Sequence, residues 1–228
     1  MRWHELAFLH RPVRAASVRA LLPPGLELDT FDGSAWLGTV PFRMSGVRAR
    51  LAPRLPGHSA FPEINLRTYV TAEGRPGVWF FSLDVTRRLV VAAARTLFHL
   101  PYHRARMAVQ TQDGWVHYAS ERATRGTPAG FRGRYRGVGA SFHAAPGSLE
   151  AWLVERYCLY AADRRARLFR CDVHHAPWTL QRAECELERD TLADALGLPT
   201  SGGEPLAHFS RDIEVLAWSL EPVGGTAR

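Results

Sequence analysis

The chain has 228 residues, of which 46% are apolar and 11% aromatic, enough for one large core and too many for a disordered chain. All 29 of its basic side chains other than histidine are arginines, and against 22 acidic residues they leave a net charge of +7. Because the sequence contains no lysine, imine-forming enzymes, pyridoxal phosphate enzymes and Walker A phosphate loops are excluded.

The cysteines and the apolar runs indicate the compartment. Cys158, Cys171 and Cys185 are an odd number of widely spaced cysteines, so we expect reduced thiols and no secreted disulfide framework. No apolar run reaches the ~18 residues of a membrane helix. We therefore expect a cytoplasmic protein that does not enter a membrane, with one domain over residues 1–228 and a flexible tail at 222–228.

Short apolar runs separated by turn residues follow one another along most of the chain. The first element is a helix that begins after Pro12, and turn dipeptides such as Asp32-Gly33 and Asp113-Gly114 then predict hairpins. Strands are expected at 26–31, 35–43, 64–72, 78–85, 104–112, 115–123, 131–142, 157–162, 167–175, 178–188 and 212–221. Helices are expected at 13–21, 87–98, 149–157 and 191–196.

This order of elements predicts the fold class. About ten strands with hairpin-length connections predict a mainly β (α+β) protein, because closing a sheet on itself removes its exposed edges. We expect a curled β-barrel, antiparallel throughout, with short helices at its rim. Residues 44–61 lack periodicity, and such a long stretch inside a compact domain predicts a lid or a disordered segment.

Polar and apolar side chains alternate along residues 63–70, and in a strand they point to opposite faces. The polar face carries Glu63, Asn65, Arg67 and Tyr69. One interpretation is a solvated outer face over an apolar core. The other is that the polar face lines the interior of the barrel, with the apolar face packed beneath the helices. Glu63 and Arg67 would then meet a small ligand whose carboxylate the arginine binds through two hydrogen bonds. The pattern leaves both interpretations open.

A series of segments runs along nearly the whole chain: LLPPGLELDTFDGSAWLGTVPF, FPEINLRTYV, GVWFFSLD, ARTLFHLPYHRARM, LEAWLVERYCLY, HHAPWTLQ and HFSR. In this order they resemble the YqjF-like bacterial family of unknown function. That family is grouped with the acetoacetate decarboxylase-like superfamily. The resemblance implies a curled antiparallel barrel around a polar cavity.

Residues 94–103, Ala-Arg-Thr-Leu-Phe-His-Leu-Pro-Tyr-His, are similar to the Gly-Arg-Glu-x-x-Gly-x-Pro-Lys-Lys motif of the decarboxylases. Arg95 and Pro101 match that motif. The imine-forming lysine falls at Tyr102, and its neighbouring lysine falls at His103. A phenol cannot form a Schiff base, so the resemblance implies a protein without the imine-dependent decarboxylation of that superfamily.

The candidate site combines the polar strand with the segment at 102–103. Its acid, base and anion-binding groups suit proton transfer or simple binding, so the catalytic group stays unknown, with Glu63, Tyr102 and His103 as candidates. Candidate ligand-binding residues are Glu63, Asn65, Arg67, Tyr69, Tyr102, His103, Tyr118 and Arg122. Which face of the strand at 115–123 points inward stays open.

A metal site and a cofactor are not expected. His174 and His175 follow Cys171, but adjacent residues of a strand point to opposite faces, and one Cys-x-x-His pair without a partner pair does not make a zinc site.

The sequence thus predicts a binding protein for a small organic molecule, in the first place a carboxylate or another anion. The alternative is a lysine-independent lyase, isomerase or hydrolase that uses Glu63, Arg67, Tyr102 and His103. The third is a nucleic-acid or protein interaction surface built on surface arginines such as those at 132, 134 and 136, although an outward-facing charged strand requires no partner. Self-association into a homo-oligomer stays open.

Overall fold

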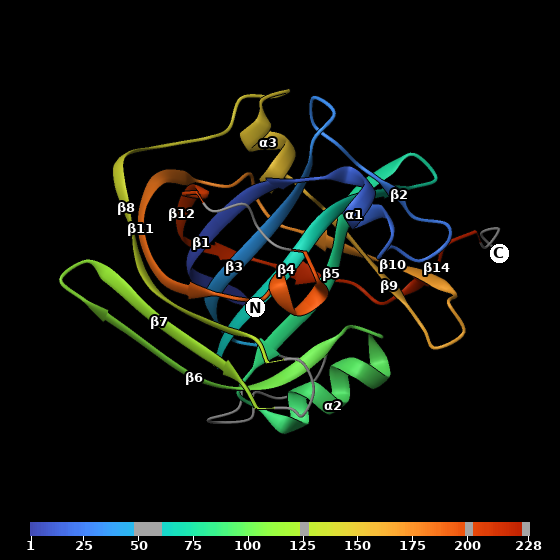
Figure 1. The fold of residues 1–228 in the computed structure, drawn as a ribbon, viewed down its shortest axis with the longest axis horizontal. Coiled ribbons are helices and arrows are strands. Elements are labelled where there is room, and N and C mark those ends of the chain that lie inside the picture. Colours follow the sequence, from blue (N-terminus) through green and yellow to red (C-terminus); the bar gives the residue numbers. More distant parts are fainter. Residues whose placement is uncertain (48–60, 124–127, 199–202, 225–228) are drawn as a thin grey trace.

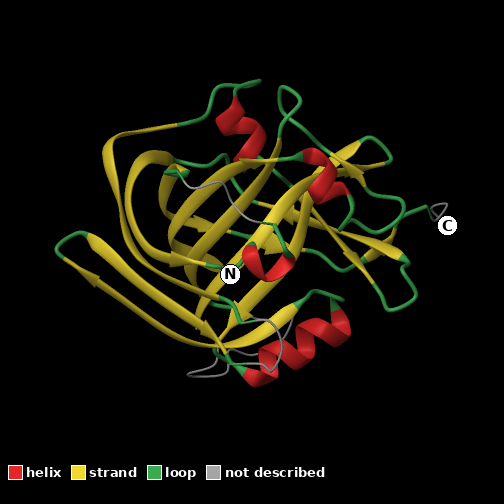
Figure 2. Ribbon diagram, in the orientation of Figure 1, coloured by secondary structure: helices red, strands yellow, loops and turns green. Residues whose placement is uncertain are grey.

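The computed structural model describes residues 1–47, 61–123, 128–198 and 203–224, and it consists mainly of strands (Figure 1, Figure 2). The strands are β1 (Arg2–Val13), β2 (Glu27–Leu28), β3 (Ala35–Ser45), β4 (Phe61–Ala72), β5 (Arg75–Val85), β6 (Tyr102–Gln112), β7 (Trp115–Arg122), β8 (Gly130–Phe142), β9 (Cys158–Ala162), β10 (Leu168–His174), β11 (Leu180–Asp190), β12 (Leu206–Glu214), β13 (Leu216–Ala217) and β14 (Glu221–Pro222). The helices are α1 (Ala15–Arg19), α2 (Arg88–Leu97) and α3 (Leu149–Val154), with a 3₁₀ turn at Asp194–Leu196. The mainly β fold with short helices is confirmed.

Nine of these strands close a ring in the order β4-β5-β6-β7-β8-β11-β12-β1-β3 and back to β4. The ring is visible in Figure 1, where the β6–β7 hairpin extends away from the other strands and α2 lies beside β6. Tight turns join several neighbours, as predicted: Asp113 and Gly114 between β6 and β7 both have positive φ, at 51° and 79°. Such turns match the right-handed twist of the strands that they connect.

Strand β5 departs from the predicted antiparallel arrangement. One of its edges pairs with β4, and its other edge is divided between two partners. Residues 83–85 pair in parallel with 102–104 of β6, and 78–79 pair in parallel with 159–160 of β9. The expectation of an antiparallel sheet throughout is therefore wrong at β5. Parallel neighbours need a crossover connection, and here α2 lies in the crossover from β5 to β6.

Two apolar cores lie on opposite faces of the ring strands β1, β3, β4 and β5. Side chains from every strand of the ring meet in its interior, among them Leu9, Ile64, Tyr118, Tyr135 and Phe209. The second core lies on the opposite face of β1, β3, β4 and β5, where α3 and the segment before β11 cover it. It includes Phe8, Phe42, Tyr69, Leu153 and Trp178. Strand β4 thus has a core on each side.

The N-terminal segment differs from the sequence expectation. Residues 2–13 form a strand that pairs with β12 on one edge and with β3 on the other, and the helix expected at 13–21 is reduced to α1. Two strand partners satisfy the backbone groups of β1, so tertiary pairing outweighs the local helical spacing.

The bounds of other elements also differ from the sequence expectation. The strand expected at 212–221 begins at Leu206 and ends at Glu214. In the expected loop at 44–61, β3 continues to Ser45 and β4 begins at Phe61, whereas 48–60 lie outside the described residues. In the expected tail, β14 pairs with β10, and 225–228 lie outside the described residues.

We predict that Gly77→Ala destabilises the fold where β5 divides. A Cβ at Gly77 would lie 2.8 Å from the Tyr160 ring and 2.9 Å from the Cys158 carbonyl oxygen. Forcing a methyl group into such a contact costs about 1–3 kcal/mol, measurable as a lower urea midpoint. The control is Gly203→Ala, because a Cβ there meets no described residue within 4 Å. Equal midpoints for the two variants would contradict the close β5–β9 contact.

Candidate functional site

Glu63 is a buried carboxyl group on the polar face of β4. Only 3% of the residue is exposed, and the hydroxyl of Tyr102, at the start of β6, donates a hydrogen bond of 2.9 Å to Glu63 Oε2. Burial raises the pKa of Glu63 to about 8, while the hydrogen bond from Tyr102 opposes that rise. Glu63 is therefore mainly protonated at pH 7, and the pair presents neutral hydrogen-bonding groups.

Arg67, four residues further along the same face, is a buried cation. It is 8% exposed, and among the described residues it has no acidic partner within ion-pair distance. One terminal nitrogen donates to the Leu153 carbonyl of α3 at 3.3 Å, and Nε has no hydrogen-bond partner. The guanidinium lies 5.5 Å from the ring centre of Phe8 and 5.8 Å from that of Tyr69. A buried charge without a counterion is costly unless something compensates it.

Tyr69 and His10 extend the polar face toward β1. The Tyr69 hydroxyl and His10 Nε2 are 2.7 Å apart, and both residues are fully buried. Burial, followed by the charges of Arg67 and His208, holds the pKa of His10 well below its ordinary value. His10 is therefore neutral at pH 7 and leaves Arg67 as the charge of this group.

Several other buried polar atoms on this face have no hydrogen-bond partner among the residues that the structure describes. They are Asn65 Oδ1, His10 Nδ1, both ring nitrogens of His208, Ser210 Oγ and Trp178 Nε1. The register of β1 against β12 places His208 opposite Phe8 and Ser210 opposite Leu6, so both share the side of the second core. Buried polar groups normally find partners, so a cluster of unpaired ones around a cation is typical of a site for a polar ligand or water.

The two faces of β4 point opposite to the sequence expectation. Ile64 and Leu66 pack inside the ring, and the polar residues face the second core beneath α3. The polar face is nevertheless buried, so the interpretation of a solvated outer face is wrong.

The remaining candidate residues do not join this cluster. Asp84 pairs with Ile64 in the β4–β5 register and so lies on the ring side, where Arg122 donates to its two carboxylate oxygens at 3.2 and 3.0 Å. His103 pairs with Asp84, and burial, then the charge of Arg122, lowers its pKa to about 4. Arg122 is thus engaged in a buried ion pair, and His103 is neutral at pH 7.

Tyr118 also lies on the ring side of β4. Its hydroxyl donates 2.7 Å to the backbone carbonyl of Glu63, so it supports β4 from within the ring. Tyr118 and Ser120 are buried, whereas His117 is exposed, which settles the inward face of this strand.

The surface arginines of β8, at 132, 134 and 136, do not form a free cationic surface. Arg134 and Arg136 form ion pairs with Glu186 and Glu184 of β11 at 2.8 and 2.6 Å, and both guanidinium groups lie over the ring of Trp115. This pairing removes the charge on which a nucleic-acid surface would depend.

The histidine pair after Cys171 has a structural arrangement. His175 is buried, stacks on Tyr157 with ring centres 4.5 Å apart, and has its Nδ1 2.8 Å from the Ala176 carbonyl. Within the described ranges, no three His, Cys, Asp or Glu residues are grouped so that they could hold a metal ion.

No helix in the described part of the chain has the length and apolarity of a membrane span.

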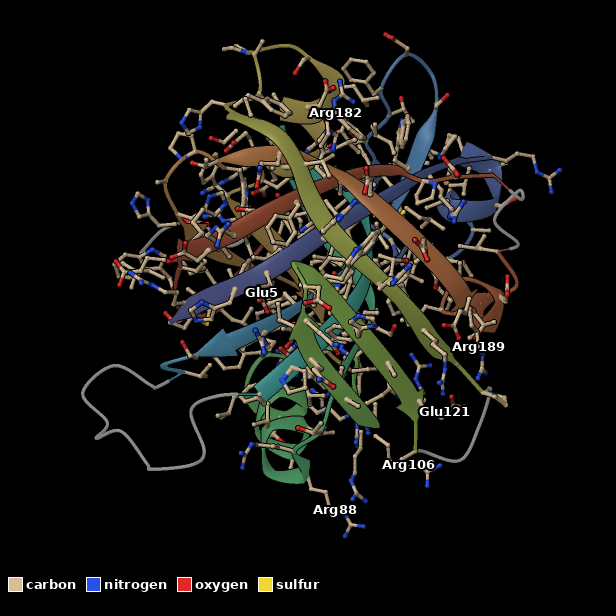
Figure 3. The ribbon with its side chains drawn as sticks, turned by 90° about the vertical axis from the view of Figure 1, so that its left-hand side faces the viewer. Glu5, Arg88, Arg106, Glu121, Arg182 and Arg189 are labelled. Atoms are coloured by element: carbon tan, nitrogen blue, oxygen red, sulfur yellow. The ribbon has the colours of Figure 1, made fainter. Side chains whose placement is uncertain are left out.

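Two cavities lie away from the Arg67 cluster. One, of about 570 Å³, lies where β1 and β4 begin and where β3 and β12 end. The other, of about 260 Å³, includes Arg106, Glu121 and Arg189 in its lining, and Figure 3 shows Glu121 and Arg189 close together. The Arg189–Glu121 ion pair measures 2.9 Å.

Sequence reasoning missed His10 and His208. Both lie on strands, β1 and the start of β12, that the pattern did not predict. The available signal was the two-residue spacing of Leu6, Phe8 and His10, which places them on one face once β1 is recognised as a strand.

We predict that Glu63→Gln removes a large pH dependence of stability. Since the folded-state pKa of about 8 lies above the ordinary 4.5, the unfolded chain loses its proton first as the pH rises. The free energy of unfolding of the wild type should therefore fall, relative to Glu63→Gln, by roughly 4–5 kcal/mol between pH 4.5 and pH 8.5. Urea unfolding across that range measures the difference. Glu73→Gln, in an exposed turn, is the control, and parallel curves for wild type and Glu63→Gln would contradict the buried, protonated carboxyl.

The chain has relatives over nearly its whole length. Residues 1–214 match the model of DUF2071, an uncharacterized conserved protein family. The chain is 45% identical over 218 residues to the uncharacterized protein YqjF of Bacillus subtilis, covering 96% of this chain and 89% of that one.

Solved structures share the fold at low identity. MppR, an enduracididine biosynthesis enzyme complexed with pyruvate, has a TM-score of 0.65 at 18% identity, covering 98% of this chain and 91% of its own. Acetoacetate decarboxylase from Legionella pneumophila has a TM-score of 0.60 at 14% identity, covering 98% and 88%. An acetoacetate decarboxylase-like enzyme from Sphingomonas wittichii has a TM-score of 0.60 at 15% identity, covering 98% and 90%. The chain therefore belongs to the YqjF-like DUF2071 family and has the fold of the acetoacetate decarboxylase-like superfamily.

Proposed function

We propose that this protein binds a small organic acid on the polar face of β4, with Arg67 as the group that holds the carboxylate. The observation that carries the proposal is that Arg67 is buried and that, within the described part of the chain, it has no acidic partner and its Nε is unpaired. A carboxylate supplies both the missing charge and the missing acceptor, and it matches the planar guanidinium with two parallel hydrogen bonds.

The neighbouring groups favour an acid that also carries a carbonyl or hydroxyl oxygen. Glu63, protonated at neutral pH, has a hydroxyl hydrogen to donate on the face that Arg67 shares, because the phenol of Tyr102 already donates its own hydrogen to Glu63 Oε2. Asn65, between Glu63 and Arg67 in sequence, has a buried, unpaired Oδ1. MppR, which has a similar fold, is complexed with pyruvate, a small 2-keto acid of this class.

A ligand at Arg67 would have to displace existing packing. The guanidinium donates to Leu153 of α3, and the second core surrounds it. We expect the carboxylate to replace the Leu153 carbonyl as acceptor and α3 to shift, since buried groups give up one partner only when another is supplied.

A catalytic role for Glu63 is the second candidate function. A carboxyl group with a pKa of about 8 can both give and take a proton near neutral pH, as a general acid–base group requires. Arg67 would then hold the substrate while Glu63 moves a proton, which describes a lysine-independent lyase or isomerase.

Thermal shift with a panel of keto, hydroxy and aromatic acids, including pyruvate, tests the binding proposal. A ligand at ~100 times its dissociation constant stabilises the native state by about 2.7 kcal/mol. For a chain of this length, a rise in Tm of roughly 5–10 °C follows from ~2–4 °C per kcal/mol. Arg67→Met retains much of the stem and should abolish the shift, and Arg67→Lys should restore little of it because a point charge lacks the planar fork.

Arg136→Met serves as the matched control, because Arg136 is an ion-paired surface arginine on β8. It should respond to the ligand like the wild type. If an acid shifts the wild type and Arg67→Met equally, Arg67 does not hold the carboxylate, and the proposal fails.

We also predict that the protein forms no imine with a keto acid. The resemblance of residues 94–103 to the decarboxylase motif implies that Tyr102 falls where that motif has its lysine, and the sequence contains no lysine at all. Borohydride reduction in the presence of pyruvate or acetoacetate should leave the intact mass unchanged, apart from any reaction at the N-terminal amine, which peptide mapping identifies. A reduced adduct on an internal peptide would refute this expectation.

A further inference from the structure

The cavity of about 570 Å³ holds a second set of chemically active side chains. Its polar lining consists of His4, Glu5, Arg43, Ser45, Arg211 and Asp212. Neither Glu63 nor Arg67 lines it, so it is separate from the carboxylate site proposed above. Its volume falls within the range of small-molecule sites, about 300–1,000 Å³.

Ser45 and His4 form a close hydrogen-bonded pair in this cavity. Ser45 Oγ, at the end of β3, lies 2.7 Å from Nε2 of His4 on β1. The strand register pairs Ser45 with Arg2 and His4 with Arg43, so the contact is diagonal across the two strands. A hydroxyl at this distance from an imidazole nitrogen has the arrangement of a nucleophile and its base.

Asp212, on the neighbouring strand β12, also lines this cavity, and its carboxylate lies 3.7 Å from the guanidinium of Arg2. It stands opposite His4 in the pairing of β1 with β12. Burial lowers the pKa of His4 and the charge of Asp212 opposes that effect, so the ring is neutral near pH 7 and can accept a proton. A carboxylate beside the base stabilises the imidazolium that proton transfer creates.

The remaining charged side chains of the lining are Glu5, Arg43 and Arg211. Glu5 has a φ of 52°, unusual for a residue with a side chain, and the Tyr135 hydroxyl holds its carbonyl at 2.9 Å. The Glu5 carboxylate accepts a hydrogen bond from Arg43. Glu5 is labelled on β1 in Figure 3. Backbone strain of this kind persists where the surrounding contacts enforce it, often at functional sites. Arg211, by contrast, has no ion-pair partner among the described residues, so its charge is available to an anion.

We propose that Ser45 and His4 are a nucleophile–base pair that hydrolyses small esters of carboxylic acids carrying a negative charge. Ser45 Oγ bonds to the ester carbonyl carbon and its proton passes to His4 Nε2. The bond from that carbon to the alcohol oxygen then breaks, and the alcohol leaves with the proton from His4. Water, deprotonated by His4, attacks the acyl–Ser45 ester, releasing the carboxylic acid and restoring the serine. Arg211 attracts the anionic group of the substrate.

The test uses two probes on the full chain. A fluorophosphonate should modify Ser45 covalently, seen as a mass increase of the intact protein and located by peptide mapping. Mono-p-nitrophenyl succinate should be hydrolysed faster than the neutral p-nitrophenyl acetate. Ser45→Ala should abolish both the adduct at that peptide and the turnover, and His4→Gln should slow turnover by about 10²–10⁴-fold. Arg211→Gln should raise KM for the anionic ester and leave that of the neutral ester unchanged.

Ser141→Ala, at an exposed serine near the end of β8, is the matched control and should retain full labelling and turnover. The Tm of each variant establishes that it is folded, and the adduct on the wild type stands without any variant. An unlabelled Ser45 in the folded wild type would overturn the proposal. So would turnover that persists in Ser45→Ala or is unaffected in folded His4→Gln, because the pair would then be only a cross-strand hydrogen bond.

Discussion

The burial of β4 on both faces is the constraint on which the rest of the structure depends. Its ring-side residues, such as Ile64 and Leu66, pack in the interior of the ring. Its opposite face, with Glu63 and Arg67, lies beneath α3. A strand with one solvated face could carry polar side chains at no cost. Here each polar group must find a partner inside the protein, and those that do not are therefore informative about function.

The divided edge of β5 attaches β9, and through it β10, to the ring. The close approach of β9 to Gly77 leaves no room for a side chain at this point. This contact lies ten residues along the chain from Arg67, on the strand that pairs with β4.

The electrostatics separate structural charges from functional ones. Arg122 has a bidentate carboxylate partner, and the arginines of β8 are paired with the glutamates of β11. A buried pair such as Arg122–Asp84 stabilises the fold little in net terms, but losing one partner is costly. Arg67 is the buried arginine that lacks such a carboxylate among the described residues, and Glu63 nearby is kept neutral by burial. A lysine in place of Tyr102 would bring a second cation and a nucleophilic amine. A phenol brings neither, so the chemistry of this face depends on hydrogen bonding and proton transfer.

The sequence by itself determined the mainly β fold, the hairpins at turn dipeptides such as Asp113-Gly114, the alternation along β4 and the exclusion of imine chemistry. These follow from local backbone preferences and from residue types that are present or absent. Only the tertiary structure decided which face of β4 lies in the ring, that β1 is a strand, and that Glu63 meets Tyr102 while His103 and Arg122 lie on the other side. A period of two defines two faces but does not say what covers either one. That depends on pairings between strands distant in sequence, such as β5 with β9, whose stability comes from packing and not from local propensity.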